Sequence, residues 1–291
     1  MLGGSGSVVP YCGAPPLPDT LWMRWNLDPV LLMALLAIGC AYALGATGLN
    51  RKFCVLPRGR QAAFYAGWAV TTACLVSPLC PLSVSLFAAR VGQHMILALI
   101  AAPLVAAGRP VAAISFLWRT SGGVARCYPE RSTWTAAPLA AAGLFAALLW
   151  FWHSPAAYGA TFTSTAAYWS MHVSMFAASV WLWSELLDRN PARVVAATGA
   201  GVISSAQMGL LGALITLAPR PLYAPHALTI AAWNLTPLQD QQLGGAIMWV
   251  PGGVVFLAVA MVMLWLTIAR APSPLIFATR SSSPLPGIAT P

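Results

Sequence analysis

LTPLQDQQLGGAIMWVPGG, residues 235–253, combines a polar start with an apolar run that continues without a charge to Ala269. A helix over Leu243–Ala269 is long enough to cross the hydrocarbon core of a bilayer, which needs roughly 20 residues. Asp240 is the only acid among the last hundred residues and stands in the predicted polar loop before this helix. Such a residue at a membrane boundary indicates a functional site. Gly244 and Gly245 predict close approach of a neighbouring helix.

The composition is that of a polytopic membrane protein. Of the 291 residues, 59% are hydrophobic and 7% are charged, whereas soluble domains carry roughly 25% charged residues. The net charge of +9 does not indicate nucleic-acid binding, because the basic residues lie in short loops between apolar runs. This distribution is typical of a topology signal. We therefore expect the lipid bilayer as a partner, and no nucleic acid.

Apolar segments of helical length predict an all-α fold with seven transmembrane helices. They are Pro29–Gly48, Gln61–Cys80, Val84–Gly108, Trp134–Trp152, Thr165–Leu186, Val194–Ala218 and Leu243–Ala269. Residues 153–164 form a charge-free predicted loop, and residues 219–242 a second loop. Within the loop 109–133, the stretch Val111–Trp118 is compatible with a short interfacial helix.

The basic residues predict the orientation of these helices. With the N-terminus outside, twelve lie on the inner side and two, Arg24 and Arg220, on the outer side. The positive-inside rule therefore places the N-terminus outside and the C-terminus in the cytoplasm. We expect an extracytoplasmic N-terminal segment over residues 1–27, a seven-helix membrane domain over 28–270, and a disordered cytoplasmic tail over 271–291. The N-terminal segment has no basic region before an apolar core, which argues against a cleaved signal peptide.

The candidate ligands gather toward the predicted outer face. His94 lies in the third predicted helix, His153 ends the fourth, and His172 lies two turns inside the fifth. Imidazole and thioether donors together suit copper, Cu(I) especially. The thioethers near these histidines are Met95, Met171, Met175, Met208 and Met248. Each methionine taken alone is more often a packing residue, and each histidine can simply bond a neighbouring helix.

Arg90 lies on the same helix face as His94 and needs an anion or a route for its head group to water. Asp240 is one candidate partner; a substrate, a partner carboxylate and simple snorkelling to the interface are the others. The cysteines show no CxxC spacing, so we expect neither a disulfide framework nor a thiol ligand at Cys74 or Cys80. No arrangement for hydrolysis or phosphoryl transfer is present, so we expect no enzymatic activity.

Several patches, in order along the chain, resemble the integral-membrane CtaG-type cytochrome c oxidase assembly factors. They are WNLDP (25–29), AFYAGW and LVSPL (63–79), QHMILALIAAPLVAAGRP (93–110), LWFWHSPAAY (149–158), the helix of His172, PLYAP (221–225) and the opening stretch. The resemblance implies a seven-helix protein of the bacterial inner membrane that delivers or inserts copper during maturation of the oxidase. Its partners would be an oxidase subunit or another copper chaperone.

The resemblance also implies site residues. The family's histidines map onto His94, His153 and His172, with Asp240 and Met248 from the last motif. Together with the thioethers near these histidines, we expect metal ligands at His94, His153, His172, Met95, Met175 and Met248, with Arg90, Gln93, Asp240 and Gln241 in support. One departure is that relatives look like HMxQHM at the third helix, where this chain has Arg90 in place of the first histidine. A positive charge beside Cu(I) weakens its binding.

Two other functions remain open at this stage. A copper permease would need ligands down to the inner side, where Met33, Met261 and Met263 are the thioethers. A haem-binding electron carrier would use two of the helix histidines as axial ligands. A retinal-type receptor is excluded, because the single lysine, Lys52, lies in a loop.

Overall fold

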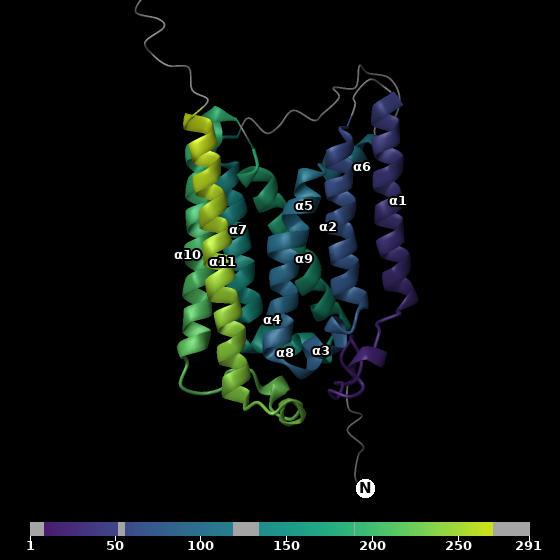
Figure 1. Ribbon diagram of the computed structural model, residues 1–291, viewed down its shortest axis with the longest axis vertical. Helices are drawn as coiled ribbons and strands as arrows, with labels where there is room; N and C mark the ends of the chain where they lie inside the picture. Colours follow the sequence, from purple (N-terminus) through teal and green to yellow (C-terminus); the bar gives the residue numbers. More distant parts are fainter. Residues whose placement is uncertain (1–8, 52–55, 119–133, 189, 270–291) are drawn as a thin grey trace, which may run out of the picture.

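The computed structural model describes residues 9–51, 56–118, 134–188 and 190–269 (Figure 1). Every regular element in these ranges is a helix and none is a strand, so the all-α prediction is confirmed. The predicted tail over 271–291 and the part of the loop over 119–133 lie outside the described residues, as do residues 1–8 of the N-terminal segment.

Long apolar helices make up most of the fold. They are α1 (Pro29–Arg51), α2 (Arg58–Val76), α7 (Ala137–His153), α9 (Thr165–Leu186), α10 (Val194–Leu217) and α11 (Pro237–Ile268). Among the described residues, four helical stretches are long and apolar enough to cross a membrane, and two bent helix pairs raise the number to six. The four are Pro29–Asn50, Phe87–Ala107, Pro191–Leu217 and Pro237–Ile268. The chain is therefore a multi-pass membrane protein.

Two of the predicted spans are bent near one end. The second predicted span continues from α2 into α3 (Leu79–Ser85) after a bend of 49°. The prediction of a loop over residues 153–164 is wrong, because most of these residues form a helix, α8 (Pro155–Thr163). The axis of α8 is bent by 71° from that of α7. The cause is Pro155, which forces Ser154 into an extended conformation and then opens the next helix at its first turn.

The third predicted span contains a widened turn. It consists of α4 (Phe87–Ile96), a π-helical turn (Leu97–Ala101) and α5 (Ala102–Ala107). Such turns insert one extra residue into a helix and often occur at functional sites. The turn directly follows His94 and Met95. The short helix expected over Val111–Trp118 is present as α6 (Pro110–Trp118).

The last helix begins six residues before the predicted start. The polar segment of the opening stretch is not a loop, because Thr236 and Gln239 form a capping box and Pro237 occupies the first turn. The Thr236 side chain accepts from the Gln239 amide, and the Gln239 side chain accepts from the Thr236 amide. A capping box stabilises a helix start because it gives acceptors to two backbone amides. Asp240 and Gln241 therefore lie inside α11.

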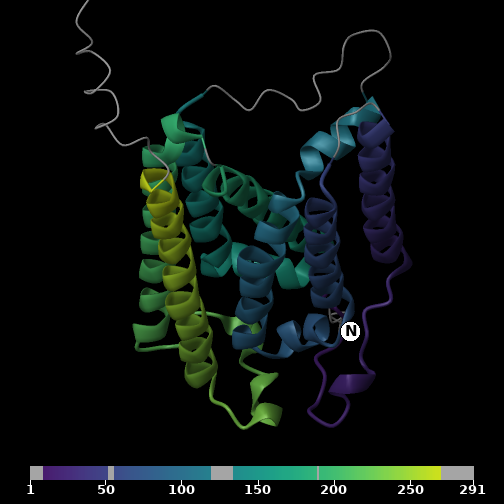
Figure 2. The same ribbon diagram turned by 45° about the horizontal axis from the view of Figure 1, so that its top comes forward.

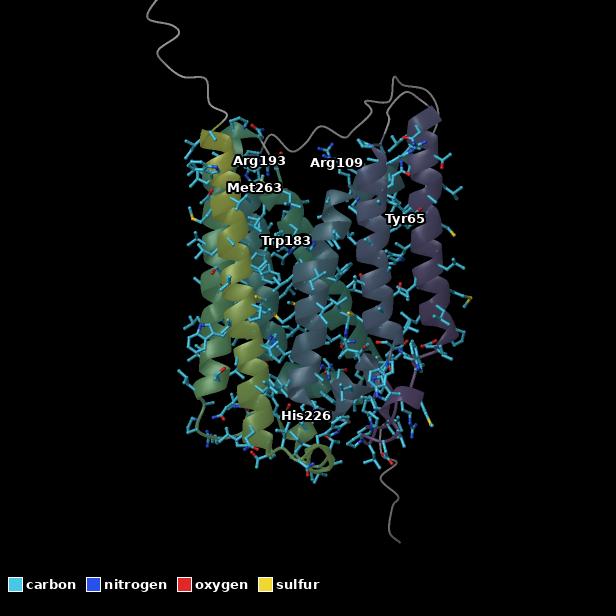
Figure 3. The ribbon with its side chains drawn as sticks, viewed as in Figure 1. Tyr65, Arg109, Trp183, Arg193, His226 and Met263 are labelled. Carbon is cyan, nitrogen blue, oxygen red and sulfur yellow. A yellow bond between two sulfur atoms is a disulfide. The ribbon has the colours of Figure 1, made fainter. Side chains whose placement is uncertain are left out.

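The bundle has two distinct ends. The segment Val9–Met23, α3, α8 and the loop between α10 and α11 lie at the lower end in Figure 1, and α6 and the C-terminal end of α11 lie at the upper end. Figure 2 shows α6 spanning from α5 to the upper end of α1. Figure 3 places His226 at the lower end, and Arg109 and Arg193 toward the upper end. His226 therefore lies at the opposite end of the bundle from Arg109 and Arg193.

Glycines allow α11 to approach both of its neighbours, as the sequence predicts. A Cβ at Gly244 would meet the Phe87 ring and the Cα of Ala88 on α4, at 3.2 Å from the latter. A Cβ at Gly212 on α10 would lie 2.7 Å from the backbone nitrogen of Trp249. Backbone contacts of this kind are accessible only to the smallest residues. They fix α11 against the helix that carries His94.

Candidate functional site

A small cavity lies between α4, α7, α8, α9, α10 and α11, with a volume of about 30 Å³. One water-sized sphere needs roughly 10–15 Å³, so the cavity accommodates one or two small atoms. It brings together side chains from helices far apart in the sequence. Those that carry possible metal donors are His94, His153, Met95, Met171, Met175, Met208 and Met248, and Arg90 and Tyr158 lie beside them.

His94 and His172 form a pair of facing rings. The ring centroids of the two imidazoles lie 5.0 Å apart, although the residues belong to α4 and α9. The Nδ1 of His172 lies 3.0 Å from the Tyr168 carbonyl oxygen and therefore donates its proton there. The Nε2 atoms of both histidines are buried and have no hydrogen-bond partner among the residues that the structure describes. Two buried imidazole nitrogens are thus available to bind a ligand from outside the described residues.

His153 borders the same cavity from the end of α7. Its Nδ1 lies 2.8 Å from the Leu149 carbonyl oxygen, so Nδ1 carries the proton and Nε2 is the free acceptor. His172 does not line the small cavity, although its ring packs against His94. In the described part of the chain, no group of three or more His, Cys, Asp or Glu residues has a geometry suited to a metal. Any metal held here would need thioether ligands.

The thioethers supply the rest of the donor set. Met95, Met175 and Met248, expected as ligands, all line the cavity, and Met171 and Met208 join them. Met208 and Met248 are each about 2% exposed or less. Thioether sulfur with imidazole is the donor set that suits Cu(I). Met171 and Met208 could have been selected from the sequence, since both lie at a depth similar to that of the chosen residues.

Arg90 lies beside the cavity in an aromatic enclosure. Its guanidinium carbon is 4.4 Å from the Phe162 ring centroid and 5.0 Å from that of Tyr158, and Nη2 donates to Thr161 Oγ1 at 2.7 Å. Cation–π contacts of this kind contribute about 0.5–2 kcal/mol each. The residue is 2% exposed, so the snorkelling alternative is wrong.

Asp240 does not pair with Arg90, and that candidate pairing is also wrong. Its carboxylate oxygens accept from the backbone amides of Phe87 at 2.6 Å and Ala88 at 3.0 Å, the first residues of α4. A carboxylate at a helix N-terminus satisfies amides that have no partner within the helix and interacts favourably with the helix dipole. Asp240 therefore fixes the start of the helix that carries His94.

The other two supporting residues, Gln93 and Gln241, also form hydrogen bonds to backbone groups. Gln241 donates from Nε2 to the Ile215 carbonyl at 3.1 Å and accepts from the Leu222 amide at 2.6 Å, so it ties the loop after α10 to α11. Gln93 donates from Nε2 to the Cys74 carbonyl at 2.7 Å, which joins α4 to α2. Their contacts orient the helices around the cavity.

His226 is a buried polar residue outside the expected set. It is 2% exposed, and its Nδ1 lies 3.1 Å from the Val84 carbonyl oxygen while Nε2 lies 2.6 Å from the Tyr158 hydroxyl. Nδ1 must donate to the carbonyl, so Nε2 accepts from the tyrosine. Burial, and secondly the charge of Arg90, lower the pKa of His226 to about 4. No sequence pattern signals this contact, because it depends on how the loop before α11 folds back.

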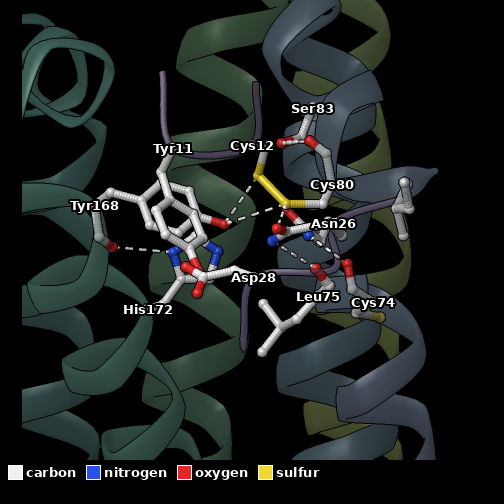
Figure 4. Close-up of a disulfide and its surroundings, with 12 residues drawn as sticks. Tyr11, Cys12, Asn26, Asp28, Cys74, Leu75, Cys80, Ser83, Tyr168 and His172 are labelled. Atoms are coloured by element: carbon white, nitrogen blue, oxygen red, sulfur yellow. Dashed lines mark hydrogen bonds between the residues drawn. A yellow bond between two sulfur atoms is a disulfide. The ribbon is translucent and has the colours of Figure 1, made fainter. Parts of the chain in front are cut away.

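A disulfide joins Cys12 to Cys80, contrary to expectation (Figure 4). The two Cα atoms are 5.5 Å apart, although the residues are separated by 68 positions in the sequence. A pair so far apart in the chain cannot be recognised from a CxxC motif. The Tyr168 hydroxyl lies 3.2 Å from the Cys12 sulfur, and the Tyr168 ring lies 4.2 Å from that of His172. The N-terminal segment is thus fixed beside the His172 helix.

A second, larger cavity of about 1430 Å³ lies between α1, α2, α5, α6 and α9. Its walls are mostly apolar, with Trp68, Trp169 and Phe176 among them. His172 lines this cavity, whereas His94, its ring partner, lines the small one. The histidine pair therefore stands between the two cavities.

Comparison with known proteins gives one match. The family model described as cytochrome c oxidase caa3 assembly factor matches residues 40–270, which include every helix from the second half of α1 to the end of α11. No match was found among curated proteins or among solved structures. The matched range covers well over half of the chain and contains all the residues that line the small cavity. The chain therefore belongs to the family of cytochrome c oxidase caa3 assembly factors.

Proposed function

We propose that this assembly factor handles copper for the oxidase and releases it at the periplasmic face of the bacterial inner membrane. The observation that carries the proposal is the pair of unpartnered imidazole nitrogens, on His94 and His172, beside a cavity lined by five thioethers. Such a site is built for a soft ion that imidazole and thioether can bind. Copper is here the cargo of the protein. Its recipient would be an oxidase subunit or another copper chaperone, and the protein itself would not be an enzyme.

Two features at opposite ends of the bundle support the orientation that we propose. We propose seven passes with the N-terminus outside, along α1, α2, α4–α5, α7, α9, α10 and α11. The Cys12–Cys80 disulfide supports an oxidising compartment at the end that carries the N-terminal segment. Arg109 and Arg193 lie toward the other end, as the positive-inside rule requires for a cytoplasmic face (Figure 3).

Release is as important as binding in such a protein. Arg90 lines the cavity and carries a charge of the same sign as Cu(I), so it opposes tight retention. His172 contacts the ring of His94 and faces the larger cavity, so it is the residue through which cargo would pass between them. The larger cavity would then receive the part of the partner that accepts copper.

The structure favours copper handling over the two alternatives. A haem with both imidazoles as axial ligands needs room for a porphyrin between the rings, and the cavity beside His94 has a volume of about 30 Å³. A permease needs donors along the whole path, whereas of the three inner thioethers Met33 and Met261 are exposed on the outer surfaces of their helices and Met263 alone lines the larger cavity. The absorption spectrum in the Soret region tests the first alternative, and copper uptake into sealed vesicles tests the second.

The decisive experiment measures copper per protein after reduction, loading with Cu(I) and gel filtration. We expect His94→Ala and His172→Ala each to lose most of the copper and His153→Ala to lose less, because the His153 ring does not pair with another imidazole. Met33→Leu, an exposed thioether on α1, is the matched control and should retain copper. Equal copper in all four variants, with normal oxidase activity in cells carrying the triple histidine mutant, would refute the proposal.

A further inference from the structure

Arg90 carries a buried positive charge that no acidic side chain in the described ranges neutralises by ion pairing. The acid expected as its partner, Asp240 of α11, is held by the backbone amides of Phe87 and Ala88 at the start of α4. The aromatic rings around the guanidinium present their negative faces and fix its position. They do not remove its net charge, and a buried ion without a counter-charge is strongly disfavoured.

The guanidinium also has a donor to spare. Nη2 donates a hydrogen bond to Thr161 Oγ1, but Nε has no hydrogen-bond partner in the described part of the chain. Arg90 lines the small cavity, and so does His94, whose Nε2 is likewise without a partner. The remaining walls are thioethers and hydrocarbon, apart from His153, Trp152 and Tyr158. The indole nitrogen of Trp152 bonds Ser174 and the Tyr158 hydroxyl bonds His226, so neither is free to solvate a cation or an anion there.

We infer that this cavity binds a monovalent anion of halide size, which serves as the counter-charge of Arg90. The volume of about 30 Å³ admits one such ion with little or no water. Walls with few donors favour anions that lose their hydration shell easily, so iodide and bromide should bind better than fluoride, and sulfate should not enter. The inference goes beyond copper handling and does not depend on it.

The test uses the full-length, metal-free protein in detergent. Sodium gluconate is replaced stepwise by sodium bromide at constant ionic strength, and the melting temperature is recorded. A ligand that binds only the folded state raises this temperature with the logarithm of its concentration once that concentration exceeds Kd, by roughly 5 °C at about 100 times Kd. We expect that response in the wild type and in Arg58→Gln, an exposed arginine at the start of α2, and its absence in Arg90→Gln.

A general salt effect has a different signature. The rise in melting temperature is then proportional to the salt concentration, and it is equal in the wild type and in Arg90→Gln. Either of these two observations would overturn the inference. The wild type alone gives a second test should Arg90→Gln fail to fold. The Kd obtained from the logarithmic rise should increase in the order iodide, bromide, chloride, and sulfate should give no such rise. A logarithmic rise with sulfate, or none with any halide, would show that the cavity is not an anion site.

Discussion

The imidazole rings of His94 and His172 lie 5.0 Å apart between two cavities, and neither Nε2 atom has a hydrogen-bond partner. Leaving buried polar nitrogens unpaired is destabilising by about 1–3 kcal/mol for each group. A fold retains such groups where a ligand satisfies them. The relationship between these two residues, more than any single motif, supports the site at which we propose that the cargo binds.

Exchange of thioether sulfur for carbon separates metal binding from packing. Leu for Met is close to volume-conserving, so Met208→Leu combined with Met248→Leu should change the free energy of unfolding by less than about 1.5 kcal/mol per site. Copper per protein after gel filtration should nevertheless fall severalfold, because two soft donors are lost. Met33→Leu is the control that should lose none. Copper retention equal to that of the wild type would show that these sulfurs only fill space.

Asp240 should act as a helix cap and not as half of an ion pair. Asp240→Asn removes the charge from two hydrogen bonds to α4 and should lower the free energy of unfolding by about 2 kcal/mol, measured by thermal or denaturant unfolding in detergent. The exposed Asp19→Asn should change it by less than about 0.5 kcal/mol. Exchanging the residues of Asp240 and Arg90 should restore nothing, and full rescue by that exchange would contradict the capping role.

The disulfide should stabilise the end of the bundle that carries the N-terminal segment. For a loop of 68 residues, chain entropy alone gives about 4 kcal/mol. Cys12→Ser and Cys80→Ser should therefore melt at lower temperature than the wild type, and reductant should bring the wild type to the same value. Cys40→Ser, which removes an exposed free thiol, is the matched control and should have no effect. If reductant leaves the wild-type melting temperature unchanged, the bridge does not form.

His226 makes stability depend on pH. Its pKa is lowered to about 4 in the folded protein from about 6.5 when unfolded, so the unfolded state binds more protons between these values. This contribution is fully present above pH of about 6.5 and is lost as the pH falls through about 4, and it amounts to about 3 kcal/mol. Melting curves recorded across this range should show the loss in the wild type and a smaller one in His226→Gln. Identical pH profiles for the two proteins would exclude His226 as the cause.

The helices could be predicted from the sequence because lipid imposes length and apolarity on each span. The start of α9 at Thr165 and the short helix after Pro110 agree with the expected positions. The start of α11 was missed although Thr236, Pro237 and Gln239 form a capping box that can be recognised in sequence. The hydrophobic pattern alone predicts a start at Leu243, because it takes no account of the capping residues before the apolar run. The π-helical turn after His94 has no such sequence signal.

The candidate site was predictable in its residues but not in its arrangement. His94, His153 and three chosen methionines do line one cavity, because a common depth along apolar helices brings side chains to one layer. Which charge meets which partner depends on helix rotation, which one sequence does not give. Arg90 therefore faces aromatic rings on α8 and α9, whereas Asp240 faces backbone amides. The Cys12–Cys80 pair was missed for the same reason, since contact between distant segments decides it.

The disulfide also has a consequence for the order of biosynthesis. Both cysteines precede His94 in the chain, and Met248 follows Cys80 by 168 residues. At about 5–20 residues per second, roughly 8–34 s pass between the synthesis of Cys80 and that of Met248. With the N-terminus outside, the first two spans can be inserted and their bridge oxidised within that interval. The disulfide-closed loop that contains α1 and α2 can then form before the ribosome has synthesised Met248, so this part of the protein would already be fixed when the cavity proposed to hold copper is completed.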